Sequence, residues 1–412
     1  MQIAAHTADV AALDAVLAGG LLTHYQPIVD LDGGDEVVAF EALTRLPDGS
    51  PYRNPDQLFA AARRQDRLVP LDLACIRSAL TGAAALPAGQ HLFVNIEPST
   101  LDGQLGQLHG WRRGAHELTL EITERALGRA PAALIRAVHE AREHGVRIAL
   151  DDVGAHPESL AYLPLLQPDV VKLDMALIRH REDRVLGRTM AGVLAYAERR
   201  GATILAEGVE TDAHLERALT LGATLGQGWR WGKAAPLPPM GAVRRPLRPA
   251  PIVADLPVVS PFQLAVEAGV SVRQGRQRTL LQISHQIEEL AQAMPGAILL
   301  AAFQGVERFT PATSGRYERL ARGCSLIAAF GVDFAPEPVP GVRGTRIDAG
   351  DPLADEWTVV ALGPQYAGAL TALDRHQGDG PDRRFSFAVT HDRDLVERIA
   401  RHLVGRIADA PQ

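Results

Sequence analysis

Short apolar runs that each end in a polar side chain recur along the N-terminal half of this 412-residue chain. The residues at the ends of these runs are Glu41, Asn95, Glu121, the pair Asp151-Asp152, Lys172, Glu207 and Gln227. A run of four to six apolar residues with such an ending is typical of a buried parallel strand with a functional tip. After Glu41 and Asn95 the endings follow one another at about the spacing of one βα unit, which predicts that they gather around the mouth of one barrel.

Helical patterns lie between these runs. Two of them, at 55–66 and 70–85, fill the long interval between Glu41 and Asn95. Eight strands with intervening helices over about 240 residues favour a TIM-like (β/α)8 barrel over an open doubly wound sheet. No glycine-rich nucleotide fingerprint opens any of the helices, and this weakens the dinucleotide-binding alternative.

The composition changes after residue 236. Residues 237–274 are rich in proline at first and lack periodicity, so we expect a semi-rigid linker there. Residues 275–412 contain an amphipathic helical pattern, the strand-like runs AILLAAF, LIAAFG, WTVVALG and RFSFAVT, and a final helical pattern. The sequence therefore predicts a barrel over 1–236 and a smaller α/β domain over 275–412.

Charge and composition narrow the class of protein. A formal net charge of -7 argues against a broad basic surface for DNA or RNA polymers, but a compact phosphate ligand bound through metal ions stays compatible with it. No apolar run is long enough to span a bilayer. A signal peptide begins with basic residues, and this chain has no Lys or Arg before Arg45. The two cysteines, Cys75 and Cys324, suggest neither a disulfide framework nor a zinc site. We expect a cytoplasmic protein without membrane contact.

The polar tips carry carboxylates and amides but no histidine or cysteine. Hard oxygen ligands without sulfur or imidazole select Mg²⁺ or Mn²⁺ over zinc. The adjacent Asp151 and Asp152 would raise each other's pKa unless a cation lay between them, and two neighbouring ions are a common device for attack on a phosphoryl group. Lys172 is one of only two lysines in the chain, the other being Lys233, and a compact ammonium there suits the control of an attacking water. The alternative is an arbitrary lysine at a strand end.

Seven motifs carry a family resemblance: FEALTRL, NIEPSTL, LEITE, DDVG, VKLD, AEGVET and QGWRWGKA. Together they resemble the EAL domain, which is named for the residues that are Glu41-Ala42-Leu43 here, and the match runs from about residue 15 to 236. The resemblance implies a modified TIM barrel whose first strand runs against the others. It also implies hydrolysis of cyclic di-GMP to linear pGpG with two Mg²⁺ or Mn²⁺ ions.

The resemblance assigns roles to individual residues. The implied ligands of the first metal are Glu41, Asn95, Glu121 and Asp151. Those of the second metal are Asp151, Asp152 and Glu207. The implied residues near the attacking water and the loop beside it are Lys172, Glu207, Glu210 and Glu124. The implied contacts to the substrate or its surroundings are Gln26, Arg45 and Gln227. For Glu210 the alternative is a cap on the helix that follows it, and for Gln26 it is an ordinary edge-strand residue.

One loop departs from the family pattern. The family usually has an aromatic residue and then Gly-Thr-Gly after the two aspartates, whereas this chain has Val153, Gly154, Ala155 and His156. In the family this loop bears on metal occupancy and on dimer contact. Two other functions therefore stay open: a receptor that binds cyclic di-GMP with little turnover, and a scaffold that recruits partners. The resemblance also admits a homodimer.

The C-terminal part resembles the DICT domain through FTPATSGRYERLA, WTVVALGPQYAGALTA and RRFSFAVTHDRDLV. That resemblance implies a sensory or regulatory domain with an unknown ligand or protein partner. Arg316, Tyr317, Trp357 and the pair Arg383-Arg384 are candidates to line a ligand pocket. The alternative is that Tyr317 and Trp357 are core aromatic residues.

Overall fold

A computed structural model describes residues 12–18, 20–87, 90–101, 117–123, 130–155, 159–179, 184–237 and 259–407. The chain divides into two compact units. The first comprises residues 1–126, 140–155 and 168–252, and the second comprises 127–139, 156–167 and 253–412. The first contains a closed barrel and the second an open sheet.

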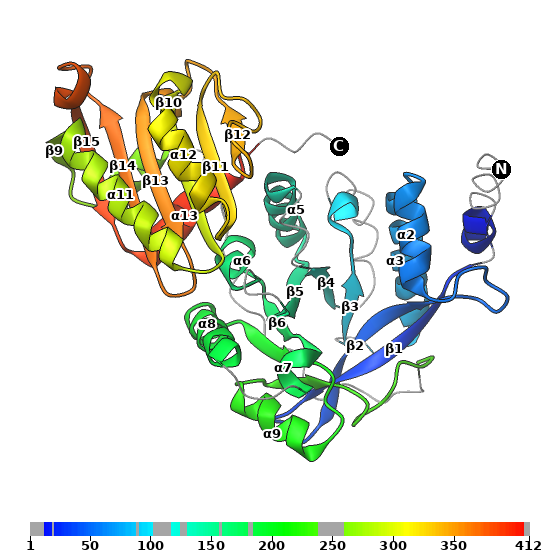
Figure 1. Ribbon diagram of the computed structural model, residues 1–412. Coiled ribbons are helices and arrows are strands. Elements are labelled where there is room, and N and C mark those ends of the chain that lie inside the picture. The colour runs from blue at the N-terminus through cyan, green and yellow to red at the C-terminus, as the bar shows by residue number, and fades with distance from the viewer. Residues whose placement is uncertain are drawn as a thin grey trace. The chain divides into compact units, whose positions relative to one another are not determined.

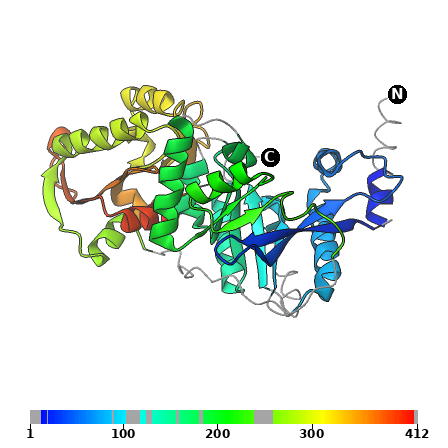
Figure 2. The same cartoon turned by 90° about the horizontal axis from the view of Figure 1, so that it is seen from below.

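The barrel consists of eight strands in sequence order (Figure 1). They are β1 (Leu22–Asp30), β2 (Glu36–Arg45), β3 (His91–Asn95), β4 (Glu117–Thr123), β5 (Arg147–Val153), β6 (Val170–Leu173), β7 (Thr203–Ala206) and β8 (Leu225–Gln227). Strand β1 pairs antiparallel with both β2 and β8, whereas the neighbouring pairs from β2 to β8 are all parallel. Figure 2 shows β1, in blue, beside the green strands that complete the barrel. The predicted barrel with a reversed first strand is confirmed.

Helices follow the parallel strands. They are α2 (Pro55–Arg64), α3 (Leu68–Gly82), α5 (Pro131–Glu143), α6 (Ser159–Leu166), α7 (Met175–Arg179), α8 (Arg184–Arg200) and α9 (Asp212–Thr220). Local sequence explains where they begin. Asn54 caps α2 by accepting a hydrogen bond from the Gln57 N–H, and Pro55 occupies the first helical turn, where no amide donor is needed. Thr211 caps α9 in the same way through the N–H of His214.

A layer of mostly apolar side chains fills the barrel interior. It includes Ile28, Ala39, Phe93, Ala149, Val170, Leu205 and Leu225, one from each strand except β4. Side chains two residues apart on a strand point to the same side. Every parallel strand of this set has a polar tip two residues beyond its core residue, as in Ala39 and Glu41 or Val170 and Lys172. The polar tips therefore form the next layer, at the carboxyl ends of the parallel strands.

The second unit contains a mixed seven-stranded sheet of order β12-β11-β10-β13-β14-β15-β9. Its strands are β9 (Arg273–Arg276), β10 (Ala297–Gly305), β11 (Cys324–Val332), β12 (Arg343–Arg346), β13 (Glu356–Leu362), β14 (Ala367–Asp374) and β15 (Arg384–Thr390). The strands β10, β11 and β12 are parallel, and the remaining pairs are antiparallel. Every residue of β10 is buried, as its continuous apolar run indicated.

Helices cover both faces of this sheet. They are α10 (Pro261–Glu267), α11 (Gln277–Ala293), α12 (Pro311–Leu320) and α13 (Arg393–Val404). Helices α11 and α12 lie on one face and α13 on the other (Figure 1). Tyr317 is fully buried and Trp357 is 9% exposed, both in the core beneath α11 and α12. The core alternative therefore holds for these two aromatic residues.

Arg316, another pocket candidate, forms an ion pair with the buried Glu288 at 2.5 Å between Nε and Oε2. The range expected as linker, 237–274, contains helix α10 and the first two residues of β9. Residues 238–258 lie outside the described part of the chain. Within the described residues, the helices are too short or too polar to cross a bilayer.

The buried Glu356 generates a prediction about stability. Its carboxylate is 2% exposed and accepts a hydrogen bond of 3.1 Å from the N–H of Phe262 at the start of α10. Burial raises the pKa of Glu356 from 4.5 to about 7. The folded state thus binds the proton more tightly, and the free energy of unfolding falls as pH rises from about 4.5 to 7.

Glu356→Gln keeps an oxygen acceptor and removes the charge. We expect it to raise the free energy of unfolding above pH 7 by up to ~3 kcal/mol, with little difference near pH 4.5. Urea denaturation followed by circular dichroism between pH 4.5 and 8 measures this. Parallel pH profiles for the two proteins would contradict it.

Candidate active site at the mouth of the barrel

Lys172, at the end of β6, is the centre of the polar layer. Its ammonium nitrogen lies 2.7 Å from Glu207 Oε1, 2.8 Å from Glu121 Oε1, 3.3 Å from Asp151 Oδ1 and 3.7 Å from Glu41 Oε2. The lysine side chain is 1% exposed. These four acids lie on β2, β4 and β5 and on the residue that follows β7. The structure therefore brings together residues up to 166 positions apart, Glu41 and Glu207, around one cation.

Asp151 and Asp152 stand at an irregularity in strand β5. The pairing of β5 with β6 shifts register between Leu150 and Val153, which marks a β-bulge. Asp152 has φ of 58°, in the left-handed region that aspartate tolerates better than most residues. Adjacent residues of a regular strand point to opposite faces, so the bulge allows both carboxylates to reach the same site.

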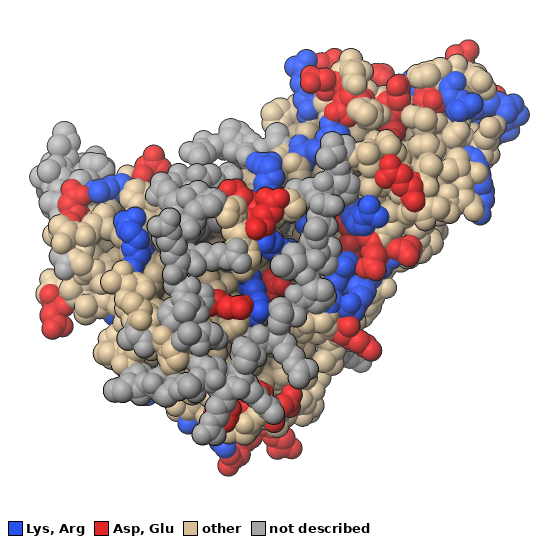
Figure 3. Space-filling view, turned by 180° about the vertical axis from the view of Figure 1, so that it is seen from behind, with Lys and Arg blue, Asp and Glu red and all other residues tan. Residues whose placement is uncertain are grey.

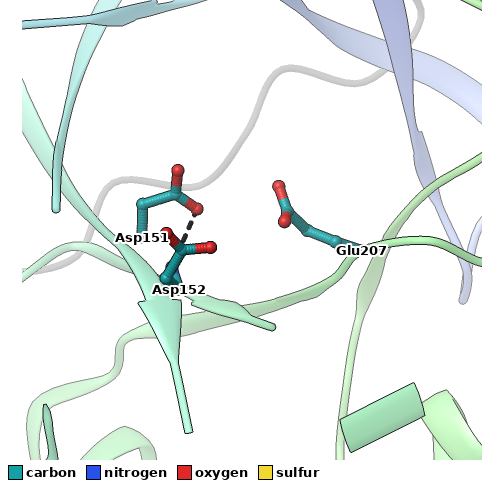
Figure 4. Close-up of side chains that lie close together, drawn as sticks. All are labelled: Asp151, Asp152 and Glu207. Atoms are coloured by element: carbon teal, nitrogen blue, oxygen red, sulfur yellow. Dashed lines mark hydrogen bonds between the residues drawn. The ribbon is translucent and has the colours of Figure 1, made fainter. Parts of the chain in front are cut away.

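The acids Asp151, Asp152 and Glu207 are close enough to share a cation. One carboxylate oxygen from each lies within 4.8 Å of the other two. Figure 4 shows the carboxylates of Asp151 and Glu207 pointing toward one another from β5 and from the loop after β7. The backbone N–H of Asp152 donates to Asp151 Oδ1 at 3.0 Å, the dashed line in the figure.

Side-chain amides hold Glu41 in place. Asn95 Nδ2 donates to Glu41 Oε1 at 3.0 Å, and Gln227 Nε2 donates to Glu41 Oε2 at 2.6 Å. Gln227 Nε2 also lies 3.3 Å from Gln26 Oε1, and Gln26 Nε2 donates to the carbonyl of Gly232 at 3.2 Å. The two glutamines thus connect the carboxylate layer to the loop after β8.

Burial and mutual charge shift the pKa values of this cluster. Burial raises the pKa of Glu121 well above its usual value, and the nearby Glu41 carboxylate adds to the rise. Burial also raises the pKa of Glu207, to about 8. At Lys172, burial would lower the pKa, but the surrounding carboxylates outweigh it and raise the pKa well above the usual value. The ammonium is therefore charged at neutral pH. Burial likewise opposes the ionisation of Glu41, but Lys172 and the hydrogen bonds lower its pKa.

The donor set suits divalent cations. Four carboxylates surround the ammonium, and Asp152 adds a fifth beside Asp151 and Glu207, so the fully ionised group has a net charge of about -4, from five negative charges and one positive. Both oxygens of Glu121 are buried and accept no well-directed hydrogen bond, although Lys172 lies 2.8 Å from one of them. Buried carboxylate oxygens without a donor are costly unless a cation approaches them. Oxygen ligands of this kind are those that Mg²⁺ and Mn²⁺ take.

Among the described residues, two of the predicted site residues, Arg45 and Glu210, have no ion pair or hydrogen bond with the Lys172 cluster. The guanidinium of Arg45, at the end of β2, donates to the carbonyl of Thr44 at 2.9 Å. Glu210 forms an ion pair with Arg179 at 2.5 Å, and its backbone N–H donates to His214 Nδ1 at 3.3 Å. Glu124 lies outside the described residues, as do His156 and the two residues that follow it, Pro157 and Glu158.

Sequence reasoning missed two features of the site. The first is the bulge that turns Asp152, for which the only sequence signal is the pair of adjacent acids. The second is Arg179 of α7, which also donates from Nε to the carbonyl of Gly208 at 3.4 Å and so ties two loops of the mouth together. Its only sequence signal is its place shortly after the VKLD motif.

Comparison with known families decides the family of the chain. The family model described as "EAL domain" matches residues 9–234, more than half of the chain. The chain belongs to the EAL domain family. The model described as "Sensory domain in DIguanylate Cyclases and Two-component system" (DICT) matches residues 259–375. Both resemblances inferred from the motifs are thus confirmed.

Two Escherichia coli (strain K12) proteins are among the similar EAL relatives. The probable cyclic di-GMP phosphodiesterase PdeB is 30% identical over 234 residues, covering 54% of this chain and 44% of PdeB. The probable cyclic di-GMP phosphodiesterase PdeG is 30% identical over 231 residues, covering 53% and 45%. This EAL chain therefore spans less than half the length of either relative.

One of the similar solved structures is the Klebsiella pneumoniae BlrP1 complex with manganese and cyclic di-GMP at pH 6. It is 30% identical, and the similarity covers 51% of this chain and 55% of the BlrP1 chain, with a TM-score of 0.45.

The Lys172 cluster generates a prediction that needs no substrate. Removing one partner of a buried ion pair costs roughly 3–5 kcal/mol. In EDTA, we expect Lys172→Met to lower the free energy of unfolding by about this much, and by more at pH 8 than at pH 6. The reason is that acids without their cation have raised pKa values, so their ionisation at higher pH opposes folding.

Lys233→Met is the matched control, because Lys233 is exposed and is the only other lysine. Its unfolding in urea should match that of the unaltered protein. Equal stability of the Lys172 and Lys233 variants would contradict the importance of Lys172 as a buried counterion.

Proposed function

We propose that this EAL chain hydrolyses cyclic di-GMP to linear pGpG at the mouth of the barrel, with two Mg²⁺ or Mn²⁺ ions. The observation that carries the proposal is the cluster of four carboxylates around Lys172, together with Asp152, which lies beside Asp151 and Glu207. The names of the similar Escherichia coli proteins support the choice of substrate. Such ions activate a water and neutralise the charge that develops on the phosphate.

The side chains of the cluster form two sets of metal ligands. One ion would be held by Glu41, Asn95, Glu121 and Asp151, and the other by Asp151, Asp152 and Glu207. Asn95 and Gln227 orient Glu41 through their amide donors. For Asn95, the side-chain oxygen remains available as a ligand because the nitrogen makes this hydrogen bond. Glu124 would support the loop beside Asp152, as the family resemblance implies.

Lys172 would hold and orient the attacking water. Its ammonium carries three donors and keeps its charge among the acids, so it can donate to the water oxygen and favour loss of the water proton. Gln26 and Arg45 would contact the nucleotide. The guanidinium of Arg45 can donate two parallel hydrogen bonds to a phosphate. Glu210 would support this site through Arg179, to which it is paired.

Surface charge agrees with a compact ligand. On the face shown in Figure 3, the positive and negative side chains are interspersed. The formal net charge is -7. Such a surface does not favour extended contact with a nucleic-acid backbone, whereas a cyclic dinucleotide needs only the local site.

We also propose that the sheet domain regulates the barrel. Helix α6, which joins strand β5 to strand β6 in sequence, belongs to the compact unit of the sheet domain. Asp151 and Asp152 precede this helix and Lys172 follows it. A ligand or partner that changes the packing of this unit would act on both sides of the metal site. The description of the DICT family as sensory supports this direction of control.

The test is incubation of the full chain with cyclic di-GMP in Mg²⁺, Mn²⁺ or EDTA, followed by chromatographic separation of the nucleotides. We expect pGpG to form with either ion and not in EDTA. Binding of intact cyclic di-GMP without pGpG would make the protein a receptor instead. Absence of both would leave the scaffold as the function.

Glu41→Ala removes an oxygen ligand and also leaves the amides of Asn95 and Gln227 without their acceptor. We expect it to lower kcat for pGpG formation at least a hundredfold, because the metal then loses a ligand. Glu216→Ala, an exposed glutamate on α9, is the control and should retain full activity. Turnover by Glu41→Ala equal to that of the control would refute the metal assignment.

A further inference from the structure

The loop after β8 presents an exposed aromatic ring at the mouth of the barrel. Trp229 is 61% exposed, the most exposed of the large hydrophobic residues among those described. It lies two residues beyond Gln227, which donates to Glu41 in the Lys172 cluster. Exposing so much of an indole to water is unfavourable unless the ring meets a partner.

The neighbouring tryptophan shows that this exposure is selective. Trp231 packs its ring against Gly226 and Leu31, where an added Cβ on Gly226 would lie 2.6 Å from the indole. The two tryptophans of the sequence GWRWGK thus have different environments: Trp231 packs against the barrel, and Trp229 faces solvent.

The backbone on both sides of Trp229 makes close contacts with the loop after β7. Gly228 packs so closely on Val209 that a Cβ would lie 2.0 Å from the Val209 carbonyl oxygen. The N–H of Arg230 donates to that same carbonyl at 3.1 Å, and the Arg230 side chain pairs with Asp212 at 2.6 Å. Farther along the loop, the carbonyl of Gly232 accepts from Gln26. A fixed aromatic platform loses little entropy when a ligand stacks on it.

The second lysine of the chain lies on this platform. Lys233 Nζ is 4.1 Å from the centre of the Trp229 ring, a cation–π contact. The chain uses arginine for 40 of its 42 basic residues, and its two lysines lie in the Lys172 cluster and over Trp229. Trp229 is 61% exposed even with this ammonium over its ring.

The geometry points to a stacking subsite for one guanine base of cyclic di-GMP on the exposed ring of Trp229. Aromatic side chains bind nucleobases by stacking, and a nearby cation favours the adjacent phosphate. Gln26 connects the loop that carries Trp229 to the Lys172 cluster: it donates to the Gly232 carbonyl and accepts from Gln227. A ligand with a planar base and an anionic phosphodiester could therefore place its base on Trp229 and its phosphodiester at the Lys172 cluster. The inference rests on the proposed function, since it names the part of the same substrate that Trp229 binds.

The experiment compares Trp229→Ala, Trp229→Phe and the unaltered full chain. We expect Trp229→Ala to raise KM, and the Kd for cyclic di-GMP in EDTA, about tenfold, with kcat changed less than twofold. Tenfold corresponds to about 1.4 kcal/mol, within the range for base stacking on an aromatic ring. The change is expected in binding because a stacked base would be held equally in the ground state and the transition state. Trp229→Phe should retain most of the affinity.

Tryptophan fluorescence separates stacking from an indirect structural effect. Stacking of guanine should quench the emission of Trp229 when cyclic di-GMP is added, and Trp229→Phe should lose this quenching while it still binds the nucleotide. Leu219→Ala, another exposed residue at the far end of α9, is the control for loss of an apolar surface side chain. Its KM and Kd should match those of the unaltered protein.

Each adverse outcome is distinguishable. Equal affinity of Trp229→Ala and the unaltered protein would overturn the stacking subsite and leave the proposed function intact. Failure of the unaltered protein to bind or hydrolyse cyclic di-GMP would overturn both. Unchanged affinity with a lower molecular mass of Trp229→Ala in light scattering would overturn the subsite and assign Trp229 to an interface between copies of the chain.

Discussion

The ammonium of Lys172 is the constraint on which the rest of the barrel mouth depends. Four carboxylates lie between 2.7 and 3.7 Å from it, and three of the five groups in this set are almost fully buried. Carboxylates at such separation repel one another strongly in a medium of low dielectric. One lysine offsets only part of this repulsion. The remaining negative charge explains why the site suits divalent cations, and why the amides of Asn95 and Gln227 are needed to hold Glu41.

The sequence predicted the fold and most of the Lys172 cluster because two regularities of parallel barrels act together. Parallel strands of a barrel end at one rim, and side chains two positions apart on a strand point the same way. Val170 and Lys172 illustrate both: the valine belongs to the interior apolar layer, and the lysine lies one layer higher. Any polar residue two positions beyond a core residue of a parallel strand therefore reaches the mouth. This rule needs no knowledge of loops.

Other features depend on tertiary contacts that the local sequence does not encode. The bulge that turns Asp152 arises from the pairing of β5 with β6, and the partner of Glu210 comes from a different loop, at Arg179. In the sheet domain, the sequence left both a pocket role and a core role open for Tyr317. Its burial, and its hydrogen bond to Glu288 at 3.2 Å, follow from the packing of α12 against α11. Such outcomes need the fold in three dimensions.

The most direct measurement of the central claim is a titration of the full chain with Mn²⁺, followed by electron paramagnetic resonance, in the presence of cyclic di-GMP. We expect two bound ions per chain whose electron spins are coupled, because Asp151 would be a ligand of both. Asp151→Asn should then weaken the binding of both ions. Binding of a single ion, or of two ions that Asp151→Asn leaves unchanged, would contradict the two-metal site at Lys172.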